Sequence, residues 1–164
     1  MALATNRPDG WPQVTAVGYV NDGFLLYCFV AANSQKRANV LLDPRVSAAI
    51  ASDAAQPCAI SGLSLAGHAR LVGDRREIDH ISRLRLQRYP EYAEAPRPNG
   101  NHAGARIMPQ PPSDLVSLLR IEPEIFSLLD YSKGFGHSEL ITFSERDLDL
   151  HLASQLHRWD RPAQ

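Results

Sequence analysis

The stretch 24–50 has the sequence FLLYCFVAANSQKRANVLLDPRVSAAI and predicts a strand, a short helix and a second strand. Residues 24–30 are seven consecutive apolar and aromatic side chains, as a largely buried strand requires. Asn33 or Ser34 can cap the helix, because a side-chain oxygen there accepts from the amides of the first turn. Asp43 precedes a proline and is therefore pushed out of the helical region. We expect the rest of the chain to be arranged around this strand–helix–strand unit.

Two cations fall where the first turn of this helix is expected. Lys36 and Arg37 occupy positions at which the helix macrodipole favours acidic side chains. A capping hydroxyl, free amides and two cations at the end of a buried strand would suit a phosphate dianion. The alternative is that both side chains point into water at a small energetic cost. No glycine lies between Gly23 and Gly62, which excludes a P-loop or a Rossmann turn here.

The composition is that of an ordinary globular protein. The chain has 164 residues, 44% of them hydrophobic, which suffices for one domain with its own core. A net charge of −1 gives no basic field that would recruit nucleic acid. No apolar run reaches the roughly 18 residues of a membrane span, and the N-terminus has no signal pattern, so we expect a cytoplasmic protein without a membrane partner. Cys28 and Cys58 are expected to be buried free thiols.

The segments around the central unit are mainly strand-like. A hairpin signal at 21–23 predicts that the first three strands form an antiparallel meander. Gly62 and Gly67 predict bends in one long strand, which would help a small sheet to close into a barrel. The expected strands are 2–5, 12–20, 24–30, 45–52, 59–72, 115–121 and 125–130, and a second helix is expected at 75–88 after the capping pair Gly73-Asp74.

Two segments have a less regular pattern. Residues 89–113 hold six of the twelve prolines and predict a surface loop, either a plain connection or a lid over a site. In the tail, 144–164, Leu148, Leu152 and Leu156 recur at helical spacing, although an alternating pattern typical of a strand is also present. We predict a helix there because the segment is long.

Residues 130–143, DYSKGFGHSELITF, carry a second group of functional side-chain types. Two glycines flank Phe135, so an aromatic ring is placed on a backbone that can turn sharply. Lys133 and His137 lie on either side of that ring. Such a tip can present a cation, an aromatic face and an imidazole together, or it can be a β-turn without a functional role.

Several segments, in this order, resemble the pyridoxamine 5′-phosphate oxidase-like, FMN-binding split-barrel superfamily. They are RPDG (7–10), PQVTAV (12–17), NSQKRANVLLDPRVSAAI (33–50) and GHARLV (67–72). The resemblance covers about 2–143, and its most specific part is the Ser34–any–Lys36 start of the short helix. It does not extend to the oxidase proper, whose tryptophan-and-arginine motif is not found here; Gly62 also stands where the oxidase has a glutamine.

The resemblance implies one domain, 1–164, that is mainly β with flanking helices (α+β). Its fold would be an antiparallel Greek-key split β-barrel of the FMN-binding type, paired as a homodimer with an FMN in each interface cleft. By the same resemblance, Ser34 and Lys36 would hold the phosphate and the tip at 131–137 would reach the partner's cofactor. The implied cofactor-binding residues are Gln13, Val14, Thr15, Phe29, Val30, Ser34, Gln35, Lys36, Arg37, Lys133, Phe135 and His137.

The implied function is an FMN-dependent oxidoreductase that transfers a hydride or electrons to or from a small-molecule substrate. The alternatives are a non-catalytic flavin-binding or storage module, or a relative that binds a deazaflavin or heme on the same fold. No catalytic residue is assigned; His137, Lys133 and His68 are acid–base candidates. The six histidines show no metal-ligand spacing with cysteine or carboxylate partners, so no metal site is predicted.

Overall fold

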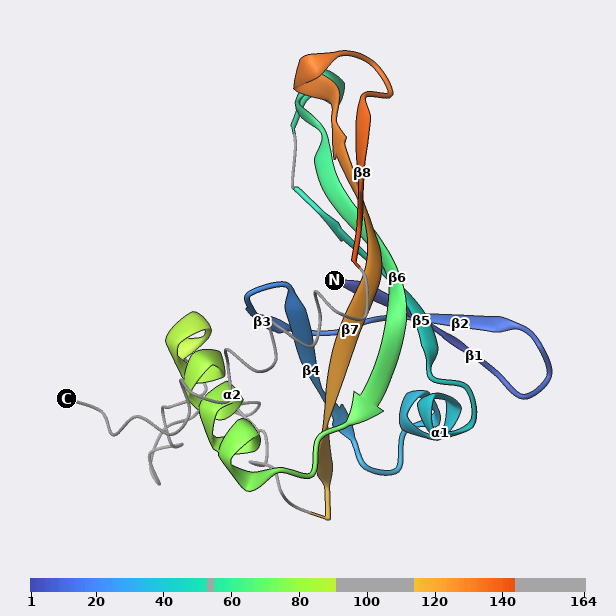
Figure 1. The fold of residues 1–164 in the computed structure, drawn as a ribbon, viewed down its shortest axis with the longest axis vertical. Helices are drawn as coiled ribbons and strands as arrows, with labels where there is room; N and C mark the ends of the chain where they lie inside the picture. The colour runs from blue at the N-terminus through green and yellow to red at the C-terminus, as the bar shows by residue number, and fades with distance from the viewer. Residues whose placement is uncertain (53–54, 91–113, 144–164) are drawn as a thin grey trace, which may run out of the picture.

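The computed structural model describes residues 1–52, 55–90 and 114–143, which form one eight-stranded antiparallel sheet with two helices beside it (Figure 1). The strand order is β2-β1-β5-β6-β7-β4-β3, and β8 pairs with β7. The elements are β1 (Ala2–Asn6), β2 (Pro12–Ala16), β3 (Val20–Asp22), β4 (Leu25–Ala31), α1 (Gln35–Leu42), β5 (Arg45–Ala51), η1 (Pro57–Ala59), β6 (Ser61–Leu71), α2 (Arg75–Arg88), β7 (Val116–Asp130), η3 (Tyr131–Lys133) and β8 (Ser138–Thr142), where η marks a 3-10 turn. This mainly β fold with flanking helices confirms the predicted split-barrel class. The predicted helix of the tail, 144–164, and residues 91–113 of the predicted surface loop lie outside the described residues.

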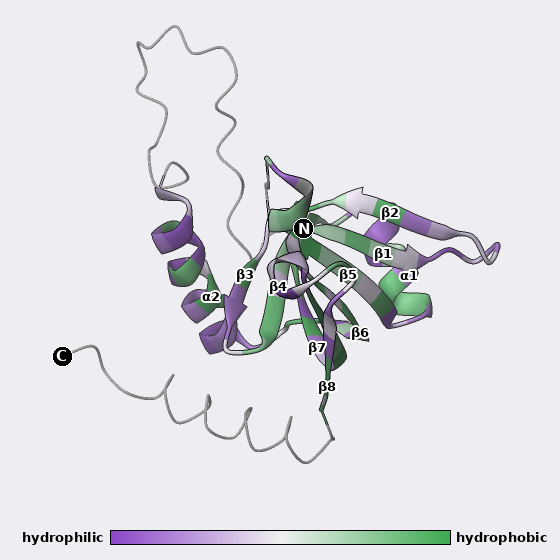
Figure 2. Ribbon diagram, turned by 90° about the horizontal axis from the view of Figure 1, so that it is seen from above, coloured by the Kyte–Doolittle hydropathy of each residue, from purple (hydrophilic) through white to green (hydrophobic). Residues whose placement is uncertain are grey.

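β4 is buried on both faces, which explains its continuous apolar sequence (Figure 2). On one face, Leu26, Cys28 and Val30 belong to the main core, together with side chains from β1, β5, β6 and β7. On the other face, Leu25 and Tyr27 pack against the apolar side of α2. A strand covered on both sides has no solvent-facing position, so its sequence need not alternate.

The predicted strand–helix–strand unit is confirmed. Ser34 is the N-cap of α1, and its Oγ accepts a hydrogen bond from the amide of Arg37 at 3.3 Å. Asp43 is the C-cap, and Pro44 follows it before β5 begins at Arg45. α2 is likewise confirmed from its Asp74 cap onwards.

The predicted meander of three strands is wrong, because the segment 12–20 divides between two edges of the sheet. β2 ends at Ala16 and pairs with β1, whereas β3 begins at Val20 and pairs with β4. These two strands are at opposite ends of the strand order. Four residues of chain reach at most about 14 Å, so the two edges must approach each other within that distance. The sheet therefore rolls into a barrel, and the predicted meander is present only as two separate hairpins, β1–β2 and β3–β4.

A break predicted between two strands at 122–124 is also absent. β7 runs continuously through Pro123, and its register with β6 shifts between Ala66 and Gly67. A proline has no amide hydrogen to give to the ladder, and a bulge is one of the few places where a strand tolerates that loss. Gly67 is needed opposite, because a Cβ there would lie 2.8 Å from the Cα of Pro123. The predicted bend at Gly67 is thus confirmed, whereas no register shift occurs at Gly62.

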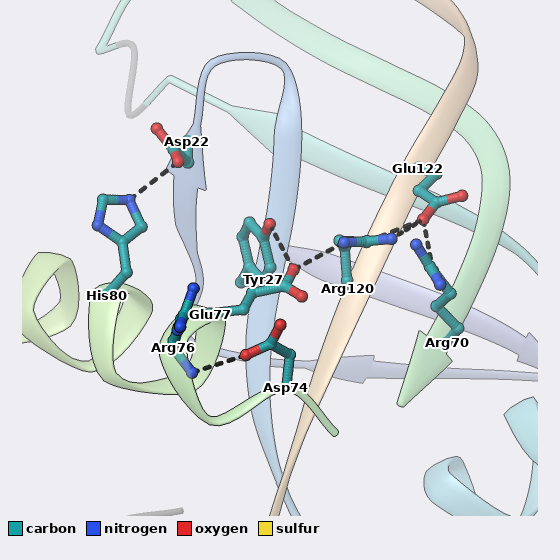
Figure 3. A network of polar contacts seen from close by, with 9 residues as sticks. All are labelled: Asp22, Tyr27, Arg70, Asp74, Arg76, Glu77, His80, Arg120 and Glu122. Carbon is teal, nitrogen blue, oxygen red and sulfur yellow. Dashed lines mark hydrogen bonds and ion pairs between the residues drawn. The ribbon is translucent and has the colours of Figure 1, made fainter. Parts of the chain in front are cut away.

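A buried network of charges holds α2 against the sheet (Figure 3). Glu77 of α2 accepts from the Tyr27 hydroxyl at 2.9 Å and from Arg120 Nη1 of β7 at 2.8 Å. Arg120 also donates through Nε to Glu122 at 2.8 Å, and Arg70 Nε reaches the same carboxylate at 2.6 Å. The Glu77 and Arg120 side chains are only 7% and 6% exposed. Burial raises the pKa of Glu77 and that of the Tyr27 hydroxyl. The charged forms of Glu77 and Arg120 are therefore stable inside the protein only while the two are paired.

Candidate functional site

The first turn of α1 presents several hydrogen-bond donors and positive charges at one place. The amides of Gln35 and Lys36 come too early in the helix to have intrahelical acceptors. The Ser34 hydroxyl, which accepts from the Arg37 amide, still has a proton to donate. No acidic residue lies in this turn. The donor set therefore suits an anion with several oxygens, such as a phosphate ester.

The two cations of this turn meet no carboxylate among the residues that the structure describes. Arg37 donates through Nε to Ser117 Oγ of β7 at 3.1 Å, which directs the guanidinium across the end of β4. Lys36 is half-buried and lies close enough to Cys28 for its charge to act on the thiol. Burial raises the pKa of Cys28 to about 12 and the charge of Lys36 opposes that rise, so this thiol stays neutral. Cys58 is exposed, which corrects the prediction that both thiols are buried.

Strand β2 places its predicted residues on two faces. Gln13 and Thr15 face α1, and Gln13 Oε1 accepts from Asn39 Nδ2 of that helix at 3.1 Å. The Thr15 hydroxyl is buried and has no hydrogen-bond partner within the described residues. Val14 faces outward and is 63% exposed. A buried hydroxyl without a hydrogen-bond partner is uncommon in proteins.

At the end of β4 the two predicted residues also separate. Phe29 is half-buried, and the guanidinium carbon of Arg85 lies 4.4 Å from its ring centroid. Val30 is only 4% exposed and packs in the main core. A contact between Val30 and a ligand would therefore have to come from its main chain.

The remaining predicted residues lie on an arm formed by β6, β7 and β8, which extends away from α1 and α2 (Figure 1). Phe135 at its tip is 96% exposed, between Gly134 and Gly136, which have φ of +136° and +74°. Lys133 Nζ donates to Glu139 at 2.8 Å, and this raises the pKa of Lys133 and lowers that of Glu139. His137 Nε2 lies 3.1 Å from the same carboxylate.

A hollow of about 510 Å³ lies beside this tip. Lys133, His137 and Glu139 line one side of it, and Ile50 and Leu129 are among the apolar side chains that line the rest.

Within one chain, the twelve predicted cofactor-binding residues form two groups. Nine lie in β2, at the end of β4 or from Ser34 to Arg37 at the start of α1, and three lie at the end of the arm, which extends away from α1 (Figure 1). Their role in cofactor binding stays a prediction.

Asn39 and Ser117 were not predicted from the sequence, although each hydrogen-bonds to a side chain of the first turn of α1. Asn39 is fully buried in α1 and accepts through Oδ1 from Gln35 Nε2 at 2.8 Å. A polar residue four positions after Gln35, on the buried face of a short helix, is the signal that could have identified it. His68, an acid–base candidate, belongs to neither group: it lies in β6 with Nδ1 2.8 Å from Glu124.

Two other features of the described residues bear on function. No helix among them is both long enough and apolar enough to pass through a membrane. In the same ranges, no three histidine, cysteine or acidic side chains gather as metal ligands would.

Comparison with known proteins identifies the family and the fold. Residues 1–119 match the family model described as "Pyridoxamine 5'-phosphate oxidase". No curated protein matches the chain. Among solved structures, a heme binding protein from Mycobacterium smegmatis is 22% identical, with a TM-score of 0.65; the match covers 86% of this chain but only 51% of that protein.

Two further structures have similar scores. A pyridoxamine 5′-phosphate oxidase-related, FMN binding protein from Nostoc punctiforme has a TM-score of 0.62 at 18% identity, covering 89% of this chain and 81% of that one. HutZ, the heme storage protein from Vibrio cholerae, has a TM-score of 0.58 at 20% identity, covering 75% of this chain and 80% of that one. At such identities the likeness shows the fold alone.

Proposed function

The chain belongs to the pyridoxamine 5′-phosphate oxidase family, and from this premise we propose that it binds FMN and transfers a hydride or electrons to or from a small substrate. The phosphate would bind to Ser34 and the first-turn amides of α1, with Lys36 and Arg37 supplying positive charge. The ring would lie along β2, near Gln13 and Thr15. When bound, FMN supplies the redox chemistry, and the protein supplies position and electrostatics.

The observation that carries this proposal is the charge of the α1 first turn. Two cations lie at the positive end of a helix dipole, with no acidic residue in that turn and no carboxylate partner in the described ranges. This arrangement is unfavourable without an anion. A dianionic phosphate would supply the missing negative charge.

We expect the purified protein to retain or take up FMN and to show the visible absorption band of an oxidised flavin. FMN should bind at least about tenfold more tightly than riboflavin, because a hydrogen bond to a charged group is worth about 1.5–3 kcal/mol. Both affinities can be measured by fluorescence quenching. Equal affinity for the two flavins would contradict a phosphate site at α1. Anaerobic bleaching by NADH or NADPH would favour an oxidoreductase, whereas a flavin that neither reduces would favour a storage module.

Heme is the second candidate, because the similar structures include a heme binding protein and a heme storage protein. Of the described histidines, His137 belongs to the predicted cofactor group. Its Nε2 meets Glu139, and its Nδ1 has no partner in the described residues. An imidazole nitrogen is a common iron ligand. A Soret band after incubation with hemin, lost in His137→Ala, would support heme in place of flavin.

We further infer that two copies of the chain form a homodimer in which the arm tip of one lies near α1 of the other. The arm carries exposed Phe135, Leu140 and Ile141, and exposed apolar side chains on a protruding element favour a partner surface. A partner would also bring together the two groups of predicted cofactor residues. Sedimentation equilibrium should give twice the chain mass. If the protein were a monomer and still bound FMN more tightly than riboflavin, this arrangement would be wrong.

A further inference from the structure

Asn39 is the point at which three elements of the candidate site are joined. Its carboxamide donates through Nδ2 to Thr5 Oγ1 at 3.0 Å and to Gln13 Oε1 at 3.1 Å. Its Oδ1 accepts from Gln35 Nε2 at 2.8 Å. Asn39 and Thr5 are 0% and 1% exposed. A single buried amide thus links β1, β2 and α1, and both of its donor hydrogens and its acceptor oxygen are used.

The geometry of this link matters because the elements it joins have different roles in the proposed FMN site. Gln35 lies in the first turn of α1, where the phosphate would bind. Gln13 lies in β2, along which the ring would lie, and Thr5 is its cross-strand neighbour in β1. A cofactor held at both ends gains affinity only if the two ends of its site are at the right separation.

We propose, on the basis of the FMN function proposed above, that Asn39 is a positioning residue that fixes the phosphate turn of α1 relative to the ring strand β2. Asn39 itself need not touch the cofactor, because it is fully buried behind the first turn. Its hydrogen bonds determine where the Ser34 hydroxyl and the first-turn amides lie relative to Gln13 and Thr15. Without them, α1 would still cap and fold locally, but it would no longer be held against β2.

This proposal predicts that substitution of Asn39 weakens the binding of FMN much more than the binding of riboflavin. In Asn39→Leu, which keeps the branching of the side chain and removes its hydrogen-bonding groups, FMN should bind about tenfold to a hundredfold more weakly, the equivalent of about one hydrogen bond to a charged group. Riboflavin, which has no phosphate, should change by less than about threefold. The measured quantity is the ratio of the two dissociation constants, because a purely structural residue would weaken both flavins together.

Thr5→Val is the matched control, since it removes one hydrogen bond of Asn39 but leaves the link between α1 and β2. It should lower the unfolding midpoint and keep the preference for FMN. If Asn39→Leu does not fold, Gln13→Met breaks the same link and should also reduce the preference for FMN, whereas a lost contact between Gln13 and the ring would weaken both flavins equally. A folded Asn39→Leu protein that keeps the wild-type preference, or loses both flavins equally, would overturn the proposal. Wild-type protein that binds FMN no more tightly than riboflavin would instead overturn the proposed function.

Discussion

Replacing Lys36 by glutamate is expected to abolish FMN retention while leaving the fold intact. The substitution puts a negative charge in the first turn of α1, in the place of one of the two cations there. A charge about 4 Å from a phosphate is worth about 4 kcal/mol at the effective dielectric of a protein surface. Even after screening by salt, we expect FMN to bind on the order of 100-fold more weakly. Equilibrium dialysis against FMN measures this loss.

Arg83→Glu provides a matched control, because it makes the same charge change at an exposed position of α2. It should bind FMN as the wild type does, and neither variant should bind riboflavin differently. Circular dichroism should show the same secondary structure in both, because Lys36→Glu puts an acidic side chain in a first helical turn, where it is favourable, and Arg83→Glu changes an exposed position. If Lys36→Glu retained FMN with wild-type affinity, the phosphate would have to bind elsewhere, and the α1 site would be wrong.

The parts of this site that could be predicted from the sequence are those determined by neighbouring residues. Ser34 caps α1 and Asp43 ends it because a capping oxygen and a following proline act over one helical turn. The cations Lys36 and Arg37 were identified for the same reason, since their unusual position relative to the helix dipole is a local property.

The parts that could not be predicted depend on pairing between distant segments. The division of 12–20 between two sheet edges follows from barrel closure, which an alternating pattern does not encode. Pro123 predicts a break, but the bulge opposite Gly67, 56 residues away, lets the strand continue. Asn39 hydrogen-bonds to Thr5 and Gln13, which are 34 and 26 residues away in the chain, so the residues around Asn39 give no indication of these partners.

The same dependence on distant partners makes Arg120 a position at which a substitution should strongly destabilise the fold. Arg120→Met is expected to lower the free energy of unfolding by about 3–5 kcal/mol, because it leaves the Glu77 carboxylate buried without its cationic partner. Urea denaturation followed by circular dichroism measures the change. Arg70→Met is the control: Arg70 is 59% exposed and contacts Glu122 from the surface, so its loss should cost less than about 1 kcal/mol.

The pH dependence of stability, and further substitutions at Glu77 and Tyr27, show whether an unpaired Glu77 charge causes the destabilisation of Arg120→Met. Burial already raises the pKa of Glu77, and removing Arg120 should raise it further. A carboxyl whose folded pKa is raised stabilises the fold below its unfolded value, near 4.5, and loses that contribution as the pH rises through the folded value. The deficit of Arg120→Met relative to the wild type should therefore be large at pH 7 and narrow as the pH falls toward 4.5.

Adding Glu77→Leu and Tyr27→Phe, which remove the carboxylate and the hydroxyl that donates to it, should recover part of the lost stability at pH 7, since a buried pair replaced by apolar side chains is often neutral. A deficit that is independent of pH and additive across the three positions would mean that Arg120 stabilises the fold by packing alone.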